Sequence, residues 1–143
     1  MYQIKCDNKG NIEYLLRVTD SAYIPNDDHN ADYLTYLEWV AKGNAAEKIQ
    51  PTPEQIQAQL TNAVQHYLDN TAKSKNYDSI LSLASYATSH NPKFAAEGQA
   101  GFLWRDAVWE TCYALLDEVM SGQREIPAVE ELIALLPTME WPS

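Results

Sequence analysis

Basic side chains are scarce in this sequence. Its 143 residues include 10 Lys and Arg against 20 Asp and Glu, which gives a formal net charge of −10. Residues 94–143 alone carry nine acidic and two basic side chains. Nucleic-acid binders gain affinity from clustered Lys and Arg, and anionic membranes attract basic segments for the same reason. The charge therefore argues against nucleic acid and against a membrane surface as partners.

Cysteine is also rare, and long apolar runs are missing. The two cysteines, Cys6 and Cys112, lie too far apart in sequence for a zinc motif or a redox pair. We expect free thiols in a reducing compartment. No apolar stretch approaches the roughly 20 residues that a transmembrane helix needs, and the segment from Met1 to Asp7 lacks the apolar run of a signal peptide. Together these absences predict a soluble, cytoplasmic protein.

No motif for catalysis, cofactor binding or metal binding is present. The sequence contains no GxxxxGK[ST], GxGxxG or GxSxG, and its three histidines fall outside any HExxH or Cys/His ligand pattern. Cys112 lies on the apolar stripe of an expected helix, which favours an inert buried thiol over a nucleophile. Asp106 and Glu110 share one helix face, where two carboxylates repel weakly instead of flanking a cleft. We predict that the protein is not an enzyme and binds neither cofactor nor metal.

Alternating apolar and polar side chains predict strands within residues 1–24. The first extended run covers residues 2–6 and the second covers residues 12–18. Between them, residues 8–11 include Gly10, which adopts the positive φ that tight turns require. We expect a β-hairpin, and an isolated hairpin is only marginally stable in water. Its edge would be suited to adding a strand to the sheet of a partner.

A short helix is expected after a polar loop, and it ends at Gly43 and Asn44. Its aromatic residues Tyr33, Tyr36 and Trp39 lie on more than one face of only three turns. One face should therefore contact something besides the helix's own core. We predict an interface on this helix.

The rest of the chain reads as a linker at 44–52 followed by helices. Apolar stripes with a period of 3.6 residues predict four helices, at about 52–74, 78–89, 94–121 and 127–136. Gly98 and Gly101 each cost about 1 kcal/mol relative to Ala, which indicates close contact with another helix. The predicted class is mainly α. It comprises a β-hairpin and short helix as an interaction arm (1–46), then a helical domain (47–143) built as a bundle of about four helices.

Three further residues, Trp104, Arg105 and Trp141, are candidates for partner binding. Arg105 follows Trp104 beside the apolar stripe, where it either clamps the helices at 78–89 and 94–121 through a carboxylate such as Glu97 or binds a partner. Trp141 lies in a tail that we do not expect to bury it within the monomer. The predicted partner-binding residues are Tyr33, Tyr36, Trp39, Trp104, Arg105 and Trp141.

Two parts of the sequence resemble small proteins encoded in bacteriophage tail and tail-fibre regions. The first likeness lies in Ile24–Asp27, Asn30–Tyr33, Tyr36–Trp39 and Gly43–Asn44; the second lies in Tyr77–Ile80, Ser85–Ala87, Phe94, Glu97–Ala100, Trp104–Asp106, Val108–Trp109 and Pro127–Leu132. The resemblance implies an assembly chaperone or adaptor that binds a β-rich tail-fibre protein in the host cytoplasm. The alternative is a minor structural component of the tail or virion. Both functions are compatible with an oligomer.

Overall fold

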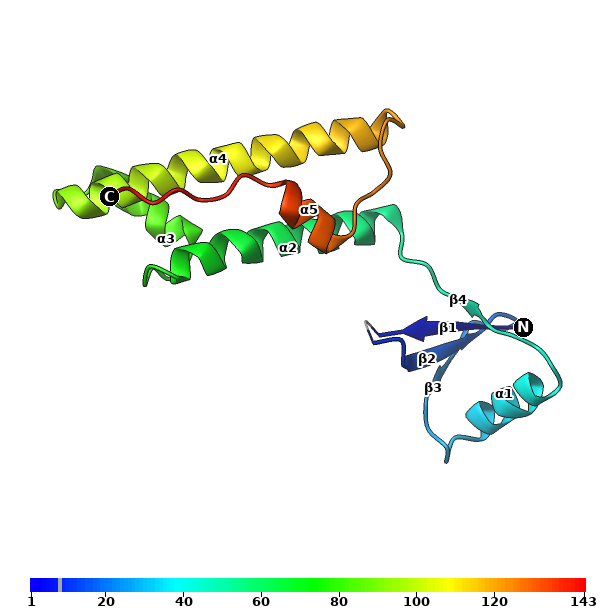
Figure 1. Cartoon of the computed structure of the whole chain (residues 1–143). Coiled ribbons are helices and arrows are strands. Elements are labelled where there is room, and N and C mark those ends of the chain that lie inside the picture. Colours follow the sequence, from blue (N-terminus) through cyan, green and yellow to red (C-terminus); the bar gives the residue numbers. More distant parts are fainter. Residues whose placement is uncertain (8) are drawn as a thin grey trace. The chain divides into compact units, whose positions relative to one another are not determined.

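The chain divides into two compact units. The computed structural model describes residues 1–7 and 9–143, and the units are Met1–Thr52 and Pro53–Ser143. The first combines a small sheet with one helix, and the second is helical (Figure 1). None of the helices in the described ranges is long and apolar enough to cross a membrane. The predicted mainly helical chain with an N-terminal β element is confirmed.

The N-terminal unit contains a four-stranded sheet. Its elements are β1 (Tyr2–Cys6), β2 (Ile12–Arg17), β3 (Ala22–Pro25), α1 (Ala31–Ala41) and β4 (Glu47–Lys48). The strand order is β3-β2-β1-β4, with β4 parallel to β1 and the other neighbours antiparallel. The expected hairpin forms and gains a strand on each side. Gly10 has the positive φ of 87° that its turn requires, whereas Asn8 of the predicted turn lies outside the described residues.

Strand β4 moves the boundary between the units. Glu47 and Lys48 pair with Gln3 and Ile4, and the N–H of Ile49 donates to the Ile4 carbonyl at 2.8 Å. Part of the predicted linker therefore belongs to the sheet, and the N-terminal unit extends to Thr52 instead of ending at residue 46. A strand of two residues is too short to show hydrophobic alternation, so the sequence gives no signal for it.

Aromatic side chains dominate the N-terminal core. The buried residues are Tyr2, Leu15, Ile24, Tyr33 and Tyr36. The ring of Tyr2 packs edge-on against Tyr36 with centroids 5.3 Å apart, which joins α1 to the sheet. The side chain of Asn30 caps α1 by accepting from the N–H groups of residues 32 and 33.

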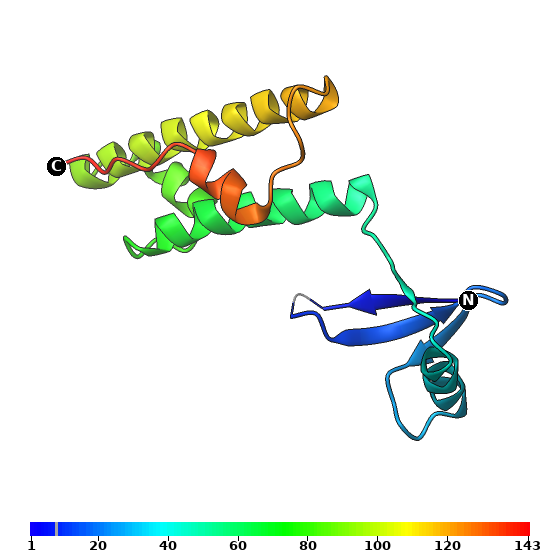
Figure 2. The same cartoon turned by 45° about the vertical axis from the view of Figure 1, so that its right-hand side comes forward.

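The C-terminal unit is built on two long helices. Its elements are α2 (Pro53–Lys73), α3 (Ile80–Ser85), the 3₁₀ turn η1 (Tyr86–Thr88), α4 (Pro92–Met120) and α5 (Val129–Leu135). Figures 1 and 2 both show α2 and α4 side by side, with α3 at one end and α5 against them. Helices α2 and α4 have 21 and 29 residues, whereas α3 and α5 have six and seven. The predicted bundle of about four helices is thus not confirmed, although the four helical segments are present.

Two helices begin at other residues than predicted, because different side chains cap their first turns. Helix α3 begins at Ile80 and not near residue 78, because it is capped by Ser79, whose Oγ accepts from the N–H of Ser82 at 3.1 Å. Helix α4 begins two residues early because the side chain of Asn91 accepts from two backbone N–H groups of the first turn. Pro92 then occupies the first helical position, where a missing N–H costs nothing.

Glycine allows α3 and η1 to approach α4 closely. A Cβ placed on Gly98 would lie 2.6 Å from the carbonyl carbon of Tyr86, and one placed on Gly101 would lie 2.6 Å from Cγ of Leu83. Real Cβ atoms do not approach other atoms so closely. The expectation that both glycines permit a close helix contact is confirmed.

The C-terminal tail is held against the helices. The Nε1 of Trp104 donates to the Pro137 carbonyl at 2.7 Å, and the Tyr67 hydroxyl donates to the same oxygen at 3.5 Å. Met139 is buried and Trp141 packs half-buried against the same core. The expectation that Trp141 lies unburied is wrong, because these hydrogen bonds direct the tail back along the helices.

The buried carboxyl of Glu97 accepts a hydrogen bond from the hydroxyl of Tyr77. Glu97 is the buried charged residue of the structure, and the Tyr77 hydroxyl donates to its Oε2 at 2.6 Å. Burial, followed by this hydrogen bond, raises the pKa of Tyr77 to about 12. Glu97 is therefore engaged by Tyr77 and not by Arg105, the partner that the sequence suggested.

Replacing Tyr77 by phenylalanine should lower the free energy of unfolding by about 1–3 kcal/mol, because the Glu97 carboxyl would lose its donor in a buried site. The phenol titrates near pH 10 when unfolded and near pH 12 when folded. Its contribution is hence complete below pH 10 and is lost as the pH rises through 12. Urea unfolding of both proteins should give a difference that shrinks in this range. A difference independent of pH would contradict the assignment.

Candidate functional site

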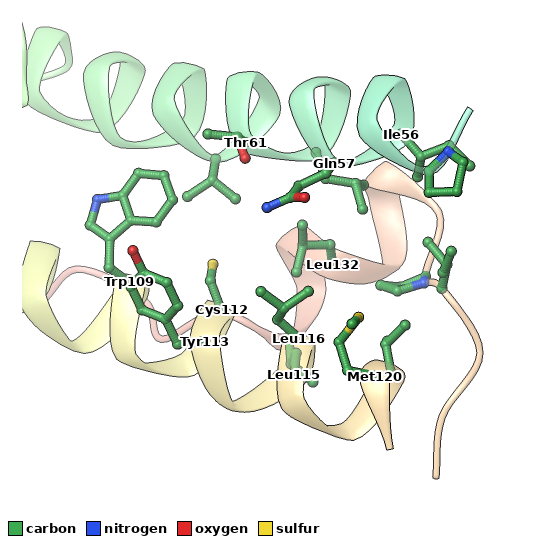
Figure 3. A pocket seen from close by; sticks show the side chains of 16 residues that line it. Ile56, Gln57, Thr61, Trp109, Cys112, Tyr113, Leu115, Leu116, Met120 and Leu132 are labelled. Atoms are coloured by element: carbon green, nitrogen blue, oxygen red, sulfur yellow. The ribbon is translucent and has the colours of Figure 1, made fainter. Parts of the chain in front are cut away.

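An open apolar groove runs between the first half of α2 and the last half of α4. Its volume is about 280 Å³. Figure 3 shows side chains of the two helices pointing toward one another across it, with Leu132 of α5 at its floor. Its main apolar walls are formed by Ile56, Leu60, Trp109, Leu116 and Met120. The groove lies wholly within the C-terminal unit.

Several apolar side chains at this groove remain in contact with solvent. Met120 is 79% exposed, Tyr113 67% and Ile126 50%. Tyr113, Leu116 and Met120 follow one another at the three- and four-residue spacing of a single helix face. A contiguous exposed apolar surface of this kind is typical of an interaction site.

The thiol in the groove has no sign of activation. Burial raises the pKa of the Cys112 thiol, so that its protonated, weakly nucleophilic form is favoured. Both cysteines are free, as predicted. Among the residues that the structure describes, no group of three or more His, Cys, Asp or Glu side chains could hold a metal ion.

Acidic side chains border the groove on α4. Glu110 and Asp117 lie one turn on either side of Tyr113, and both are exposed. Neither takes part in an ion pair within residues 1–7 and 9–143. The two arginines of the C-terminal half have acidic neighbours already: Arg124 contacts Glu118 at 2.8 Å, and Arg105 lies 3.7 Å from Asp106. This edge of the groove therefore carries uncompensated negative charge.

A second apolar surface lies on α1. Leu34 is 47% exposed, Leu37 is 40% exposed, and the exposed Ala41 lies on the same face. Val40, 38% exposed, lies at its border. We call Leu34, Leu37 and Ala41 the α1 outer face. A helix that is apolar all round is usually buried all round. The exposed fractions of Leu34 and Leu37 show that the described residues leave this face of α1 partly uncovered.

The predicted aromatic interface on α1 faces inward. Tyr33 and Tyr36 are 8% and 6% exposed and belong to the N-terminal core, while the Trp39 ring packs 5.2 Å from that of Tyr2. These three side chains are occupied within their own unit. Sequence periodicity indicated two apolar faces on α1, and only the sheet decides which of them is covered.

The C-terminal candidates also have roles within the chain. Trp104 is 6% exposed and holds the tail, and the Trp141 ring lies 5.6 Å from the Nζ of Lys75. The guanidinium of Arg105 lies 5.4 Å from the ring of Phe102 on its own helix. The predicted clamp between two helices by Arg105 is therefore not formed. The structure joins Trp104 and Trp141 to one core.

The residues that sequence reasoning missed are aliphatic and not aromatic. Leu34 and Leu37 were not among the predicted partner-binding residues, and neither were Leu116 and Met120, which line the groove. No protein-family model, no curated protein and no solved structure matches the chain.

Proposed function

We propose that this protein is a non-enzymatic adaptor or chaperone that binds a β-rich tail-fibre protein while a phage tail assembles in the host cytoplasm. The phage connection rests on the sequence resemblance described above. The observation that carries the binding role is the α1 outer face, formed by Leu34, Leu37 and Ala41. A short helix with apolar side chains on both faces, only one of them covered, is suited to contact with a partner.

The sheet offers a second means of contact. Strand β3 forms an outer edge, because it is paired only to β2. An edge strand can add to the sheet of a β-rich partner. At its end Pro25 has no N–H to donate, which limits such pairing to the first part of the strand. The opposite edge is strand β4, which has only two residues and therefore offers fewer backbone groups for such pairing. We therefore assign strand addition a smaller role than the α1 outer face.

The double variant Leu34→Gln, Leu37→Gln should bind the fibre protein at least about tenfold more weakly, because each leucine loses apolar area that the partner would bury. The measurement is co-purification, then titration, after co-expression with the tail-fibre protein of the same genome. Glutamine favours helices, so α1 should remain folded. The matched control is Leu81→Gln, since Leu81 is 72% exposed in the other unit.

Two results would contradict this proposal. Equal binding by the double variant and the Leu81 control would exclude the α1 outer face, and absence of any complex would exclude the chaperone function. Mass spectrometry of purified phage particles tests the same proposal differently. A chaperone leaves before the particle is complete, so finding this chain in particles at a fixed stoichiometry would favour a structural tail component instead.

A further inference from the structure

We propose that the groove between α2 and α4 binds an amphipathic helix of a partner protein, with Lys or Arg beside the apolar face of that helix. This would be a second binding site, in a different unit from the α1 outer face, and it does not depend on the fibre protein. A chain with both sites would connect two partners.

The shape of the groove suits a helix. Its walls are two long helices that lie side by side in both views (Figures 1 and 2), and the apolar side chains along them have helical spacing. A third helix laid between two others with its apolar face inward is a common recognition mode. The volume of about 280 Å³ is at the lower limit for a pocket that encloses a small molecule, roughly 300 Å³. An open groove of this size fits a few side chains projecting from a partner better than an enclosed ligand.

The edge charge selects the kind of helix. Glu110 and Asp117 lie one turn on either side of the exposed Tyr113, and neither forms an ion pair among the described residues. Lys73 is the last residue of α2 and Lys75 follows it, beyond the groove-lining part of the helix, which ends at Val64. A partner helix with Lys or Arg along one flank would place positive charge against this edge. Such complementary charges raise the association rate and exclude acidic competitors.

Charge also argues against two other occupants of the groove, namely a second copy of the protein and its own helix α1. A second copy would bring another acidic α4 edge toward the first, in a protein of net charge −10, and like charges at an interface oppose association. Helix α1 has Asp32 and Glu38 but no Lys or Arg. Neither occupant supplies the positive charge that the groove edge lacks. A helix from a different protein is therefore the occupant that the observations favour.

Binding of designed peptides to the full-length protein tests the proposal. The probe is a fluorescein-labelled helical peptide of roughly 18 residues, with leucines on one face and lysines on one flank. Its partner peptide has the same leucines but glutamates in place of the lysines. We expect fluorescence anisotropy to show binding of the lysine peptide at least about tenfold tighter than binding of the glutamate peptide. This preference should weaken as salt is added.

Two pairs of variants separate the apolar and charged contributions. Met120→Gln should weaken the lysine peptide about fivefold or more, whereas Leu81→Gln should not, although both residues are largely exposed. Glu110→Gln with Asp117→Asn should reduce the preference for lysine, whereas Asp28→Asn with Glu140→Gln, which are also exposed but lie outside the groove lining, should not. Far-ultraviolet circular dichroism of each variant shows whether it is folded.

Three results would overturn the proposal. The first is no binding of either peptide to the folded protein, and the second is equal binding of both peptides. The third is dimerisation of the protein alone, measured by sedimentation and lost in Met120→Gln, which would place a second copy in the groove. None of them bears on fibre binding by α1, because that experiment uses variants of the other unit and a different partner.

Discussion

Replacing Gly98 by alanine should lower the free energy of unfolding by about 2 kcal/mol, although the same exchange in an open helix raises it by about 1 kcal/mol. The added Cβ would lie 2.6 Å from the Tyr86 carbonyl carbon and 3.0 Å from Cα of Ala87. Both are backbone atoms, so relief requires that η1 move away from α4. Overpacking of this kind costs about 1–3 kcal/mol or more, which outweighs the gain in helix propensity.

The matched comparison is Gly101→Ala in the same helix. There the added Cβ meets Leu83 side-chain atoms, with Cγ at 2.6 Å, and a side chain can rotate where a backbone cannot. We expect a smaller loss than for Gly98→Ala. The measurement is urea unfolding followed by circular dichroism for both variants and the parent. A Gly98→Ala variant as stable as the parent, or more stable, would show that the close approach of η1 to α4 is absent.

Replacing Trp104 by alanine should destabilise the C-terminal unit by about 3–5 kcal/mol, the usual cost of deleting a buried large aromatic side chain. The indole is 6% exposed, packs 5.5 Å from the ring of Tyr67, and donates to Pro137. Its loss leaves a cavity and removes the stronger of two donors to the carbonyl that begins the tail. We therefore expect the segment from Thr138 onward to be released as well.

The variant Trp104→Phe separates packing from hydrogen bonding. Phenylalanine fills most of the site but cannot donate, so the loss should be about 1–2 kcal/mol. Unfolding by urea gives the energies, and hydrogen–deuterium exchange of residues 138–143 reports release of the tail. Unchanged exchange of this tail in Trp104→Ala would contradict this role of the indole, because the tail would then be held independently of it.

Long elements with a clear period were predictable, and short ones were not. The helix predicted at 52–74 corresponds to α2, and the helix predicted at 94–121 corresponds to α4. Strand β4 has two residues and no periodic pattern, so only its backbone pairing to β1 reveals it. The early start of α4 depends on Asn91, one of several residues in that turn with a capping side chain. Local rules fix such starts only to within a few residues.

The surfaces were harder to predict than the elements, because exposure depends on what covers a face. The sequence indicated that α1 has apolar side chains to spare, and Leu34 and Leu37 are indeed exposed. The sequence does not show that the sheet buries Tyr33 and Tyr36 and leaves the two leucines exposed. Likewise, Leu116 belongs to an apolar stripe that predicts a buried helix face, and nothing local shows that α3 and α5 are too short to cover its whole length. Tertiary arrangement determines both surfaces.

Site-specific photo-crosslinking at Leu37 tests the central claim most directly. A benzophenone amino acid at this position, in cells that express the chain with the phage tail proteins, should crosslink to the tail-fibre protein. The same group at Leu81, which is more exposed but lies in the other unit, should not. Crosslinks to the fibre protein from Leu37 alone are the predicted result. No fibre crosslink from Leu37, or equal crosslinks from both positions, would contradict the account.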